Sequence, residues 1–403
     1  MTASTPITLD RTGRHLHTEA AQLRAAGPAV RVQLPENLTA WSVTRGDIVK
    51  KLLTDNRVSK DARASWPGYQ PGAIAWLTSW VDVISMFTSD GPDHHRLKKL
   101  IGSVFNARGI DALRPAIEAI VADLISGLRR HPSGDVVNLR AEFSYQLPTR
   151  LICDLFGVPT RQRPKMLRVI DAILDTQATD AEAAATQRDL YAAMEALIEA
   201  KRRSPGEDMT SGLLAAHEED GDRLSADELV STLILMIGAG SETAVALIDH
   251  AVLELFRHPD QLARVLADPD LWDEVIEETL RLHGPIMHLP MRYATDDIDL
   301  GDDVTIRCGD LILIAFAAHG RDPNVHADPD TFDLDRADKQ HLAFGYGIHY
   351  CLGAALAKLE ARIALPALFD AFPDVRLEEG YVPEPQPSFI AHDVRDLNVR
   401  LTT

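Results

Sequence analysis

Cysteine is scarce in this chain, with three residues among 403, at positions 153, 308 and 351. A set so small and odd in number argues against a disulfide framework and indicates a reducing compartment. No run approaches the roughly 18 consecutive apolar residues of a membrane span. Residues 1–14 also lack the apolar core of a secretory signal. We therefore expect a cytoplasmic protein with no membrane partner.

Positive charge is also in deficit. The chain has 41 lysines and arginines against 60 aspartates and glutamates, a formal net charge of −19, which argues against nucleic acid as a partner. Low-complexity linkers, internal repeats and charge blocks that would divide the chain are absent too. With 45% hydrophobic residues the chain can bury a large core, and we expect a single domain over residues 1–403.

Among the features that are present, a glycine-rich loop at residues 344–353 (sequence FGYGIHYCLG) contains Cys351 and leads into a helical pattern at residues 352–369. Glycine allows sharp turns and close approach of the backbone to another group. A cysteine at a helix N-terminus faces free N–H groups and the positive end of the helix dipole, which favours the thiolate. The pattern indicates a thiolate ready to bind a metal. The alternative is a buried cysteine after a loop.

The longest helical pattern begins at a Ser-x-x-Glu capping box, residues 225–228, and ends at a proline. It is mostly apolar all round and about 50 Å long at 1.5 Å per residue, so we expect a central helix. Gly240 in its middle suggests that something packs closely, and Thr243 can bond the carbonyl of Ala239 and bend the helix. Glu242 could relay protons at such a bend; the alternative is an exposed carboxylate on a core helix.

Three further patterns are weak when taken alone. His94 and Lys98 are four residues apart and share a helix face, which a solvated basic helix would also explain. Glu278 and Arg281 are three apart and can form an ion pair of a common kind. A stretch rich in tryptophan, glycine and proline at residues 61–86 could line an apolar pocket or cover an edge of the core.

Taken in order, these patterns resemble the cytochrome P450 family in its soluble bacterial form. The cysteine loop fits the haem-binding motif Phe-x-x-Gly-x-x-x-Cys-x-Gly, residues 239–243 fit the oxygen-activation motif Ala-Gly-x-(Asp/Glu)-Thr, and residues 278–281 fit Glu-x-x-Arg. The family's His-x-x-x-Arg motif is matched with Lys98 in place of arginine, and lysine lacks the planar fork of arginine. Thr331 stands where the family frequently has arginine, so Arg336 or another group would have to complete that network.

The resemblance implies a mainly α fold with small β-sheets, in which haem lies between the long central helix and the cysteine loop. The smaller, β-rich part is expected mainly at residues 25–60 and 286–320 with the C-terminal tail. The helical part is expected at roughly residues 90–285 and 340–370.

The resemblance also implies roles for individual residues. Cys351 would be the axial ligand of the iron of haem b, and Glu242 and Thr243 would relay protons during oxygen activation. Glu278 and Arg281 would be a structural pair. The residues expected to bind the cofactor are His94, Lys98, Ala239, Gly240, Arg292, Phe344, Gly345, His349, Cys351 and Gly353, with His94, Lys98, Arg292 and His349 at the propionates. Those expected around the substrate are Trp76, Trp80, Met86, Ile237, Met287, His288, Leu289 and Ile390.

The implied activity is monooxygenation, in which one oxygen atom of O2 enters an apolar small molecule by hydroxylation or epoxidation. The expected substrates are polyketide or macrolide, terpenoid or steroid-like compounds of secondary metabolism. Because the chain has no flavin or iron–sulfur segment, electrons would come from a separate ferredoxin and ferredoxin reductase, docking at Lys98, Lys99, Lys358 and Arg362. Two alternatives remain: a peroxide-dependent haem-thiolate enzyme, whose relatives usually lack the acid–threonine pair, and a non-catalytic haem-binding protein.

Overall fold

Strands from distant parts of the chain join in one main sheet. The computed structural model describes residues 6–102, 105–219 and 224–402. The sheet has the order β1 (Ile7–Thr8), β2 (Val30–Gln33), β3 (Thr39–Val43), β9 (Leu311–Ala315), β6 (His288–Ala294), β4 (Val58–Ser59). β1 with β2 and β3 with β9 pair in parallel, and the other neighbours are antiparallel. β9 is apolar and buried along its whole length, as expected for a strand covered on both faces.

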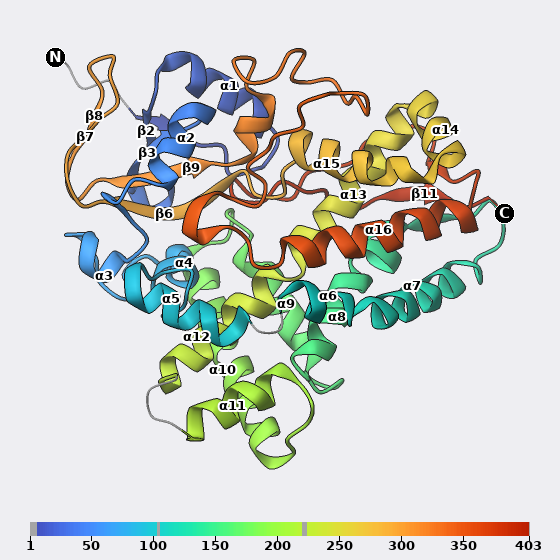
Figure 1. Ribbon diagram of the computed structural model, residues 1–403, viewed down its shortest axis with the longest axis horizontal. Coiled ribbons are helices and arrows are strands. Elements are labelled where there is room, and N and C mark those ends of the chain that lie inside the picture. Colours follow the sequence, from blue (N-terminus) through green and yellow to red (C-terminus); the bar gives the residue numbers. More distant parts are fainter. Residues whose placement is uncertain (1–5, 103–104, 220–223, 403) are drawn as a thin grey trace.

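Helices make up most of the rest of the molecule, as predicted. In Figure 1 the main sheet lies at the upper left with α1 and α2, while the long helices lie below it and to the right. The helices are α1 (Leu16–Ala26), α2 (Gly46–Leu53), α3 (Ala62–Ser65), α4 (Thr78–Val81), α5 (Gly91–Gly102), α6 (Ala107–Asp111), α7 (Arg114–Leu128), α8 (Gln146–Leu155), α9 (Arg163–Ile173), α10 (Asp180–Arg203), α11 (Met209–Glu219), α12 (Ala226–Ala239), α13 (Glu242–Arg257), α14 (Pro259–Ala267), α15 (Trp272–Leu282) and α16 (Ala354–Ala371).

Two small sheets complete the fold. One has the order β10 (Arg376–Leu377), β11 (Asn398–Arg400), β5 (Val136–Asn138), and the other pairs β7 (Ile298–Asp299) with β8 (Thr305–Ile306). The first ties the C-terminal tail to β5, a strand within the segment predicted to be helical. A short strand of this kind is paired by a distant part of the chain, so local pattern does not reveal it.

The central helix is interrupted, whereas the sequence predicted one continuous helix. Its capping box at Ser225 and Glu228 forms as predicted, but α12 ends at Ala239 and α13 begins at Glu242. Ser241, between them, has a ψ of −78°. Within the described residues, the segment from Ala226 to Arg257 is the one helical segment long and apolar enough to span a membrane, and 72% of its most apolar window is buried in the protein. It is therefore placed as a core helix.

A cluster of four histidines joins α1 to the core. His17 comes from α1, His250 from α13, His283 from the end of α15, and His392 from the C-terminal segment. The rings of His17 and His392, and those of His250 and His283, lie 4.5 Å apart between centroids. Burial lowers the pKa of His17, His283 and His392 well below the ordinary value and that of His250 to about 4. Burial therefore favours the uncharged form of all four rings.

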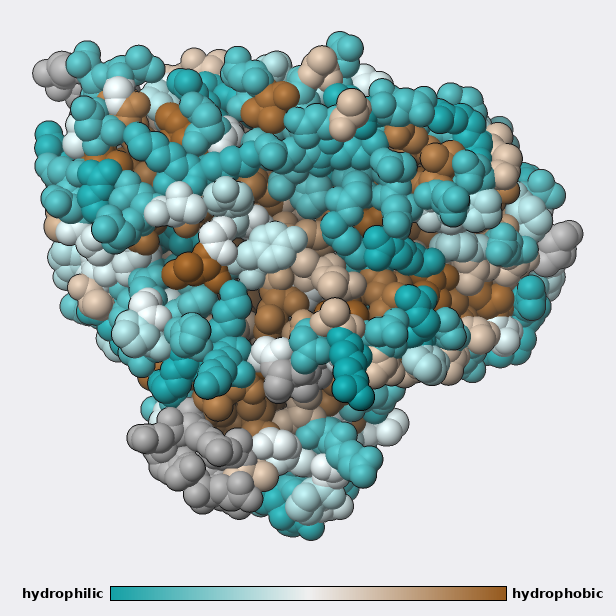
Figure 2. Space-filling view, viewed as in Figure 1, coloured by the Kyte–Doolittle hydropathy of each residue, from teal (hydrophilic) through white to brown (hydrophobic). Residues whose placement is uncertain are grey.

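The surface reflects the charge of the chain. In the view of Figure 2 it is mostly hydrophilic, with apolar side chains gathered in the middle of the face, in the region between α5 and α16 in Figure 1. Exposed large apolar side chains of the described chain include Tyr346, Ile348 and Tyr350. All three belong to the cysteine loop, which therefore combines a buried framework with accessible apolar groups.

Candidate active site

The cysteine loop is shaped by two glycines and one backbone hydrogen bond. Gly345 and Gly347 have positive φ values of 74° and 75°, a conformation that favours glycine. A Cβ atom at Gly347 would lie 2.8 Å from the carbonyl oxygen of Leu53. The N–H of Cys351 donates to the carbonyl of Phe344 at 2.8 Å. The loop thus turns back on itself and presents Cys351 just before α16 begins.

Cys351 lines a cavity and is exposed through it. Burial raises its pKa, while hydrogen bonds from the N–H groups of Gly353 and Ala354 and the charge of Lys98 act in the opposite direction. The sequence predicted that the helix N-terminus would favour the thiolate. These N–H contacts act in the predicted direction, and the opposing influence is burial.

The interruption of the central helix faces this cavity. The Thr243 hydroxyl donates to the carbonyl of Ala239 at 2.9 Å, as predicted. A Cβ atom at Gly240 would lie 2.8 Å from the carbonyl oxygen of Met236 and 2.6 Å from Cδ1 of Ile152 on α8, so close packing favours glycine here. Glu242 is buried, with 8% of its surface exposed, which contradicts the alternative of a solvated carboxylate.

The cysteine loop and the helix interruption line one cavity of about 320 Å3. Its wall is mostly apolar, and it contains every residue that the sequence analysis assigned to proton relay or to the cofactor. These are His94, Lys98, Ala239, Gly240, Glu242, Thr243, Arg292, Phe344, Gly345, His349, Cys351 and Gly353. Of the expected substrate residues, Trp80, Met86 and Leu289 also line it.

Five residues expected at the substrate do not line the cavity: the partly buried Trp76 and the buried Ile237, Met287, His288 and Ile390. Trp76 packs edge-on against the ring of Phe389. His288 donates from Nδ1 to the carbonyl of Phe389 at 2.8 Å, and burial lowers its pKa to about 4. Neighbouring residues of a strand face opposite sides, so Leu289 reaches the cavity and His288 does not. The sequence alone could not show which face of this strand points into the cavity.

Buried cations gather on one side of the cavity. Among the described residues, the Arg292 guanidinium makes no hydrogen bond or ion pair, and burial lowers its pKa to about 10. Lys98 donates to the carbonyl of Ile348 at 2.8 Å. Lys60, which the sequence analysis missed, is buried; its Nζ lies 3.6 Å from the ring centroid of Phe87 and 3.3 Å from the carbonyl oxygen of Pro290. Burial and the charge of Arg292 lower the pKa of Lys60 well below its ordinary value.

Two histidines and one carboxylate complete this side. The His94 and His349 rings lie 4.6 Å apart between centroids, and Nε2 of His349 is 3.5 Å from a carboxylate oxygen of Asp90. Burial lowers the pKa of both histidines, that of His349 to about 4. Asp90 also accepts from the Ser59 hydroxyl and from the N–H of Lys60. This wall thus has one carboxylate, Asp90, against three basic side chains, Arg292, Lys98 and Lys60.

A second network, also missed from the sequence, holds Glu242. Arg140 donates to Glu242 at 2.7 Å, to Asp249 at 2.8 Å and to Asp393 at 2.5 Å. On the far side lies a second cavity of about 600 Å3, and Glu242 and Thr243 line both cavities. The second cavity also contains Asp171, whose pKa is raised to about 7 by burial and by Glu242, and which accepts from the Tyr145 hydroxyl at 2.7 Å.

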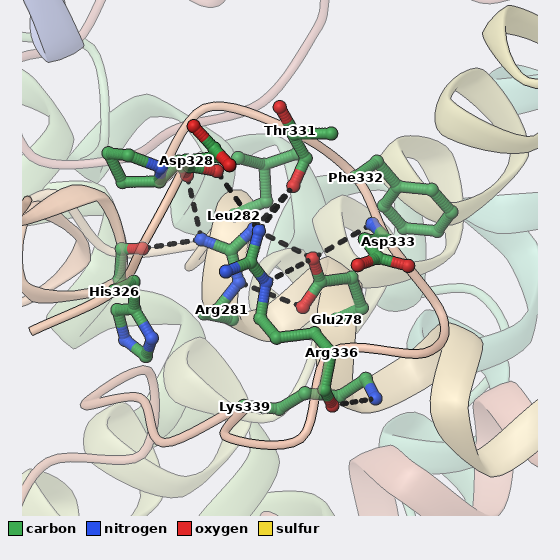
Figure 3. Close-up of polar contacts among 12 residues, drawn as sticks. Glu278, Arg281, Leu282, His326, Asp328, Thr331, Phe332, Asp333, Arg336 and Lys339 are labelled. Carbon is green, nitrogen blue, oxygen red and sulfur yellow. Dashed lines mark hydrogen bonds and ion pairs between the residues drawn. The ribbon is translucent and has the colours of Figure 1, made fainter.

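The Glu278–Arg281 pair is fully buried and bidentate, with N···O distances of 2.7 and 2.8 Å. Figure 3 shows Arg336 completing the network from the segment after Thr331, with its Nε 3.0 Å from Glu278. Arg336 also donates to the carbonyls of Ala327 and Thr331. Arg336 therefore takes the role of the arginine that the family frequently has at the position of Thr331.

Comparison with known proteins gives one consistent answer. The family model for cytochrome P450 matches residues 152–392. The chain is 44% identical to 2-hydroxy-5-methyl-1-naphthoate 7-hydroxylase from Streptomyces carzinostaticus, over 92% of this chain and 91% of that protein. It is 37% identical to vitamin D(3) 25-hydroxylase from Pseudonocardia autotrophica, over 90% and 88% of the two chains. The solved structure of CYP154A1 from Streptomyces coelicolor A3(2) is 46% identical and superimposes with a TM-score of 0.93, covering 98% of this chain and all of that one.

The fold and the cavity thus define a haem-dependent oxygenase. The chain belongs to the cytochrome P450 family and is a monooxygenase. Members of this family use haem whose iron is held by a cysteine thiolate, act on apolar substrates and, in bacteria, generally need redox partners. The cavity of this chain fits such a cofactor: a thiol on one wall, apolar sides, and a cluster of cations with Arg292 unpaired among the described residues.

Proposed function

We propose that Cys351 holds the iron of haem b in the 320 Å3 cavity, and that the protein hydroxylates or epoxidises an apolar small molecule there. The observation that carries this proposal is the cavity itself, with a loop thiol at one wall and the pair Glu242 and Thr243 at another. Bound haem would supply the activation of O2 and the insertion of one oxygen atom into the substrate. The chain would supply the surroundings in which that chemistry proceeds.

Cys351 would act as a thiolate fixed by its own loop. The N–H groups of Gly353 and Ala354 point at the sulfur and would stabilise its negative charge once a metal removes the proton. The basic side chains on the other wall would bind the two carboxylates of the cofactor. Arg292, Lys98, His94 and His349 are joined by Lys60 in this role, because a buried charge without a partner is costly and a pair of anions removes that cost.

Glu242 and Thr243 would move protons into the cavity. The ion pair with Arg140 fixes the Glu242 carboxylate, and the hydrogen bond to Ala239 orients the Thr243 hydroxyl. The second cavity reaches Glu242 from the other side, and Asp171, with a pKa of about 7, can take up and release a proton near neutral pH. The presence of this pair argues against a peroxide-dependent enzyme.

The substrate would be an apolar ring compound of the polyketide or macrolide, terpenoid or steroid-like kind. Trp80, Met86 and Leu289 supply apolar surface on the cavity wall. The names of the two relatives, hydroxylases of a naphthoate and of vitamin D(3), support this class.

A ferredoxin, with its reductase, would deliver electrons in the cytoplasm. Lys98 and the exposed Lys99 lie on α5. Lys358 and Arg362 on α16 already pair with Glu277 and Asp273. The positive charge that binds the ferredoxin would therefore come mainly from α5.

The first test is the absorption difference spectrum of the reduced protein with and without carbon monoxide. Wild type should show the red-shifted Soret band of thiolate-ligated haem. Cys351→Ala should lose it, and Cys308→Ala, which changes an exposed cysteine, should keep it. A band typical of histidine ligation, or an unchanged band in Cys351→Ala, would overturn the proposal.

A further inference from the structure

Three histidines of the cluster described above come together from three separate parts of the chain. His17 lies on α1, His283 follows α15, and His392 lies in the C-terminal segment. Each offers one ring nitrogen, and the three nitrogens all lie within 4.8 Å of one another. The cluster lies outside the set of residues that line either of the two cavities of the proposed active site.

The ring nitrogens are buried without partners. Both nitrogens of His17 and Nδ1 of His392 are shielded from water and have no hydrogen bond to any described residue. A buried polar atom left without a partner costs about 1–3 kcal/mol. Leucine or phenylalanine would fill the same volume without that cost, so packing alone does not account for histidine at these positions. Unpaired buried groups of this kind need an explanation, and a bound ion is one that satisfies them.

His283 is oriented as a metal ligand would be. Its Nε2 donates to a carboxylate oxygen of Glu254 at 2.9 Å, which leaves the lone pair on Nδ1. Metal-binding histidines commonly hold a carboxylate through the second ring nitrogen in this way. Arg321 lies 3.5 Å from Nδ1, a long contact, and its guanidinium is anchored elsewhere, on the carbonyl of Leu282 at 2.9 Å and on Asp330 at 3.1 Å.

We propose that His17, His283 and His392 form a site for a divalent transition metal such as Zn2+, with water as the fourth ligand. Three atoms no more than 4.8 Å apart lie within about 2.8 Å of their common centre, and Zn–N bonds are about 2.0–2.1 Å. Each ring would therefore move inward by less than about 1 Å. His250 stacks on His283 with 4° between the ring planes and donates to the carbonyl of His392 at 3.2 Å, which holds two of the ligands in place.

The metal would fasten both ends of the chain to the core. His392 donates its N–H to the carbonyl of Pro285 at 2.8 Å, and Ala391 pairs with Ile286. Pro285 and Ile286 line both cavities, so the site lies next to one wall of the proposed active site. Its effect would be structural, on the N-terminal helix and on this wall.

The test uses the full chain without an affinity tag, purified with its cofactor and dialysed against a chelator. Titration calorimetry with Zn2+ alone should give one tight site per chain, and bound zinc should raise the melting temperature. Co2+ in place of zinc, recorded as a difference spectrum against the zinc-loaded protein so that the haem bands cancel, should give the visible absorption of a tetrahedral nitrogen site. His17→Phe keeps the ring volume, removes both nitrogens and should weaken zinc binding at least tenfold. His15→Phe, an exposed position at the start of the same helix, should not.

Absence of a stoichiometric zinc site in wild type would overturn the proposal, as would equal affinity in His17→Phe and wild type. The cobalt spectrum of wild type needs no variant, so the proposal can fail even where His17→Phe does not fold. The Soret band, recorded in the same samples, reports on the haem site separately.

Discussion

Two buried arginine networks in this molecule are built in opposite ways. In one, Arg281 and Arg336 share a single carboxylate, Glu278. In the other, Arg140 alone holds three carboxylates, Glu242, Asp249 and Asp393. The first has an excess of positive charge and the second an excess of negative charge.

The two networks differ in how the excess charge is stabilised. The guanidinium N–H groups of Arg281 also donate to the backbone carbonyls of Gly320, Pro329 and Thr331. The backbone therefore supplies the hydrogen-bond acceptors that Glu278 alone does not. Around Arg140, Glu242 lines both cavities and Asp393 lines the larger one, and burial raises the pKa of Asp249 and Asp393. The network of Arg281, whose donors are all hydrogen-bonded, stabilises the fold. The Arg140 network has more carboxylates than cations, so its carboxylates can take up and release protons.

Breaking the first network should have the largest effect. Arg281→Leu leaves the fully buried Glu278 carboxylate without its bidentate partner, and removing one member of a buried pair costs about 3–5 kcal/mol. Urea unfolding followed by circular dichroism measures the loss. The control is Arg307→Leu, which removes an exposed pair with Asp297 and should cost less than about 1 kcal/mol. A loss in Arg281→Leu no larger than the control would contradict the comparison.

Breaking the second network should affect turnover more than folding. Glu242→Gln removes the proposed proton donor, which is worth about 10²-fold or more in rate, while Arg140 keeps Asp249 and Asp393 as partners. Product formed per electron consumed, with a surrogate ferredoxin and reductase, measures the effect. Glu118→Gln changes an exposed carboxylate and should leave the yield unchanged. A wild-type yield in Glu242→Gln would rule out the assigned role.

The first network is visible in the sequence and the second is not, for a physical reason. Glu278 and Arg281 are neighbours on one helix, so spacing alone brings them together. Arg140 lies 102 residues from Glu242 and 253 from Asp393. No periodic pattern encodes a contact made only by folding, and the same holds for Lys60 beside Arg292.

The interruption of the central helix shows the same limit. The sequence predicted the close packing at Gly240 and the hydrogen bond from Thr243 to Ala239. It did not predict that the helix divides there, because the group that packs against Gly240 is Ile152 on α8. Local helix propensity predicts that a helix forms here, but a contact with a distant residue determines whether the helix is continuous.

The second network should also make stability depend on pH. Asp171 has a pKa raised from 3.8 to about 7, so between these values the folded protein keeps a proton that the unfolded chain has lost. Stability should therefore fall as pH rises from about 4 to 7, by up to about 1.4 kcal/mol per pH unit from this group. Asp171→Asn should remove that slope, measured by urea unfolding at several pH values. Asp370→Asn, at an exposed position, should keep it, and equal slopes in all three proteins would contradict the prediction.

The smallest effect should come from restoring arginine at position 331. Thr331 is exposed, and Glu278 already accepts from Arg281, from Arg336 and from the N–H of Asp333. Because the Glu278 carboxylate already accepts these hydrogen bonds, Thr331→Arg should change the unfolding free energy by less than about 0.5 kcal/mol.

Arg336→Ala should cost about 2 kcal/mol of unfolding free energy. In that background, Thr331→Arg should recover a measurable part of the loss. Equal effects of Thr331→Arg in both backgrounds would show that Arg336 does not fill that place, since a shared partner must produce coupling in a double-mutant cycle.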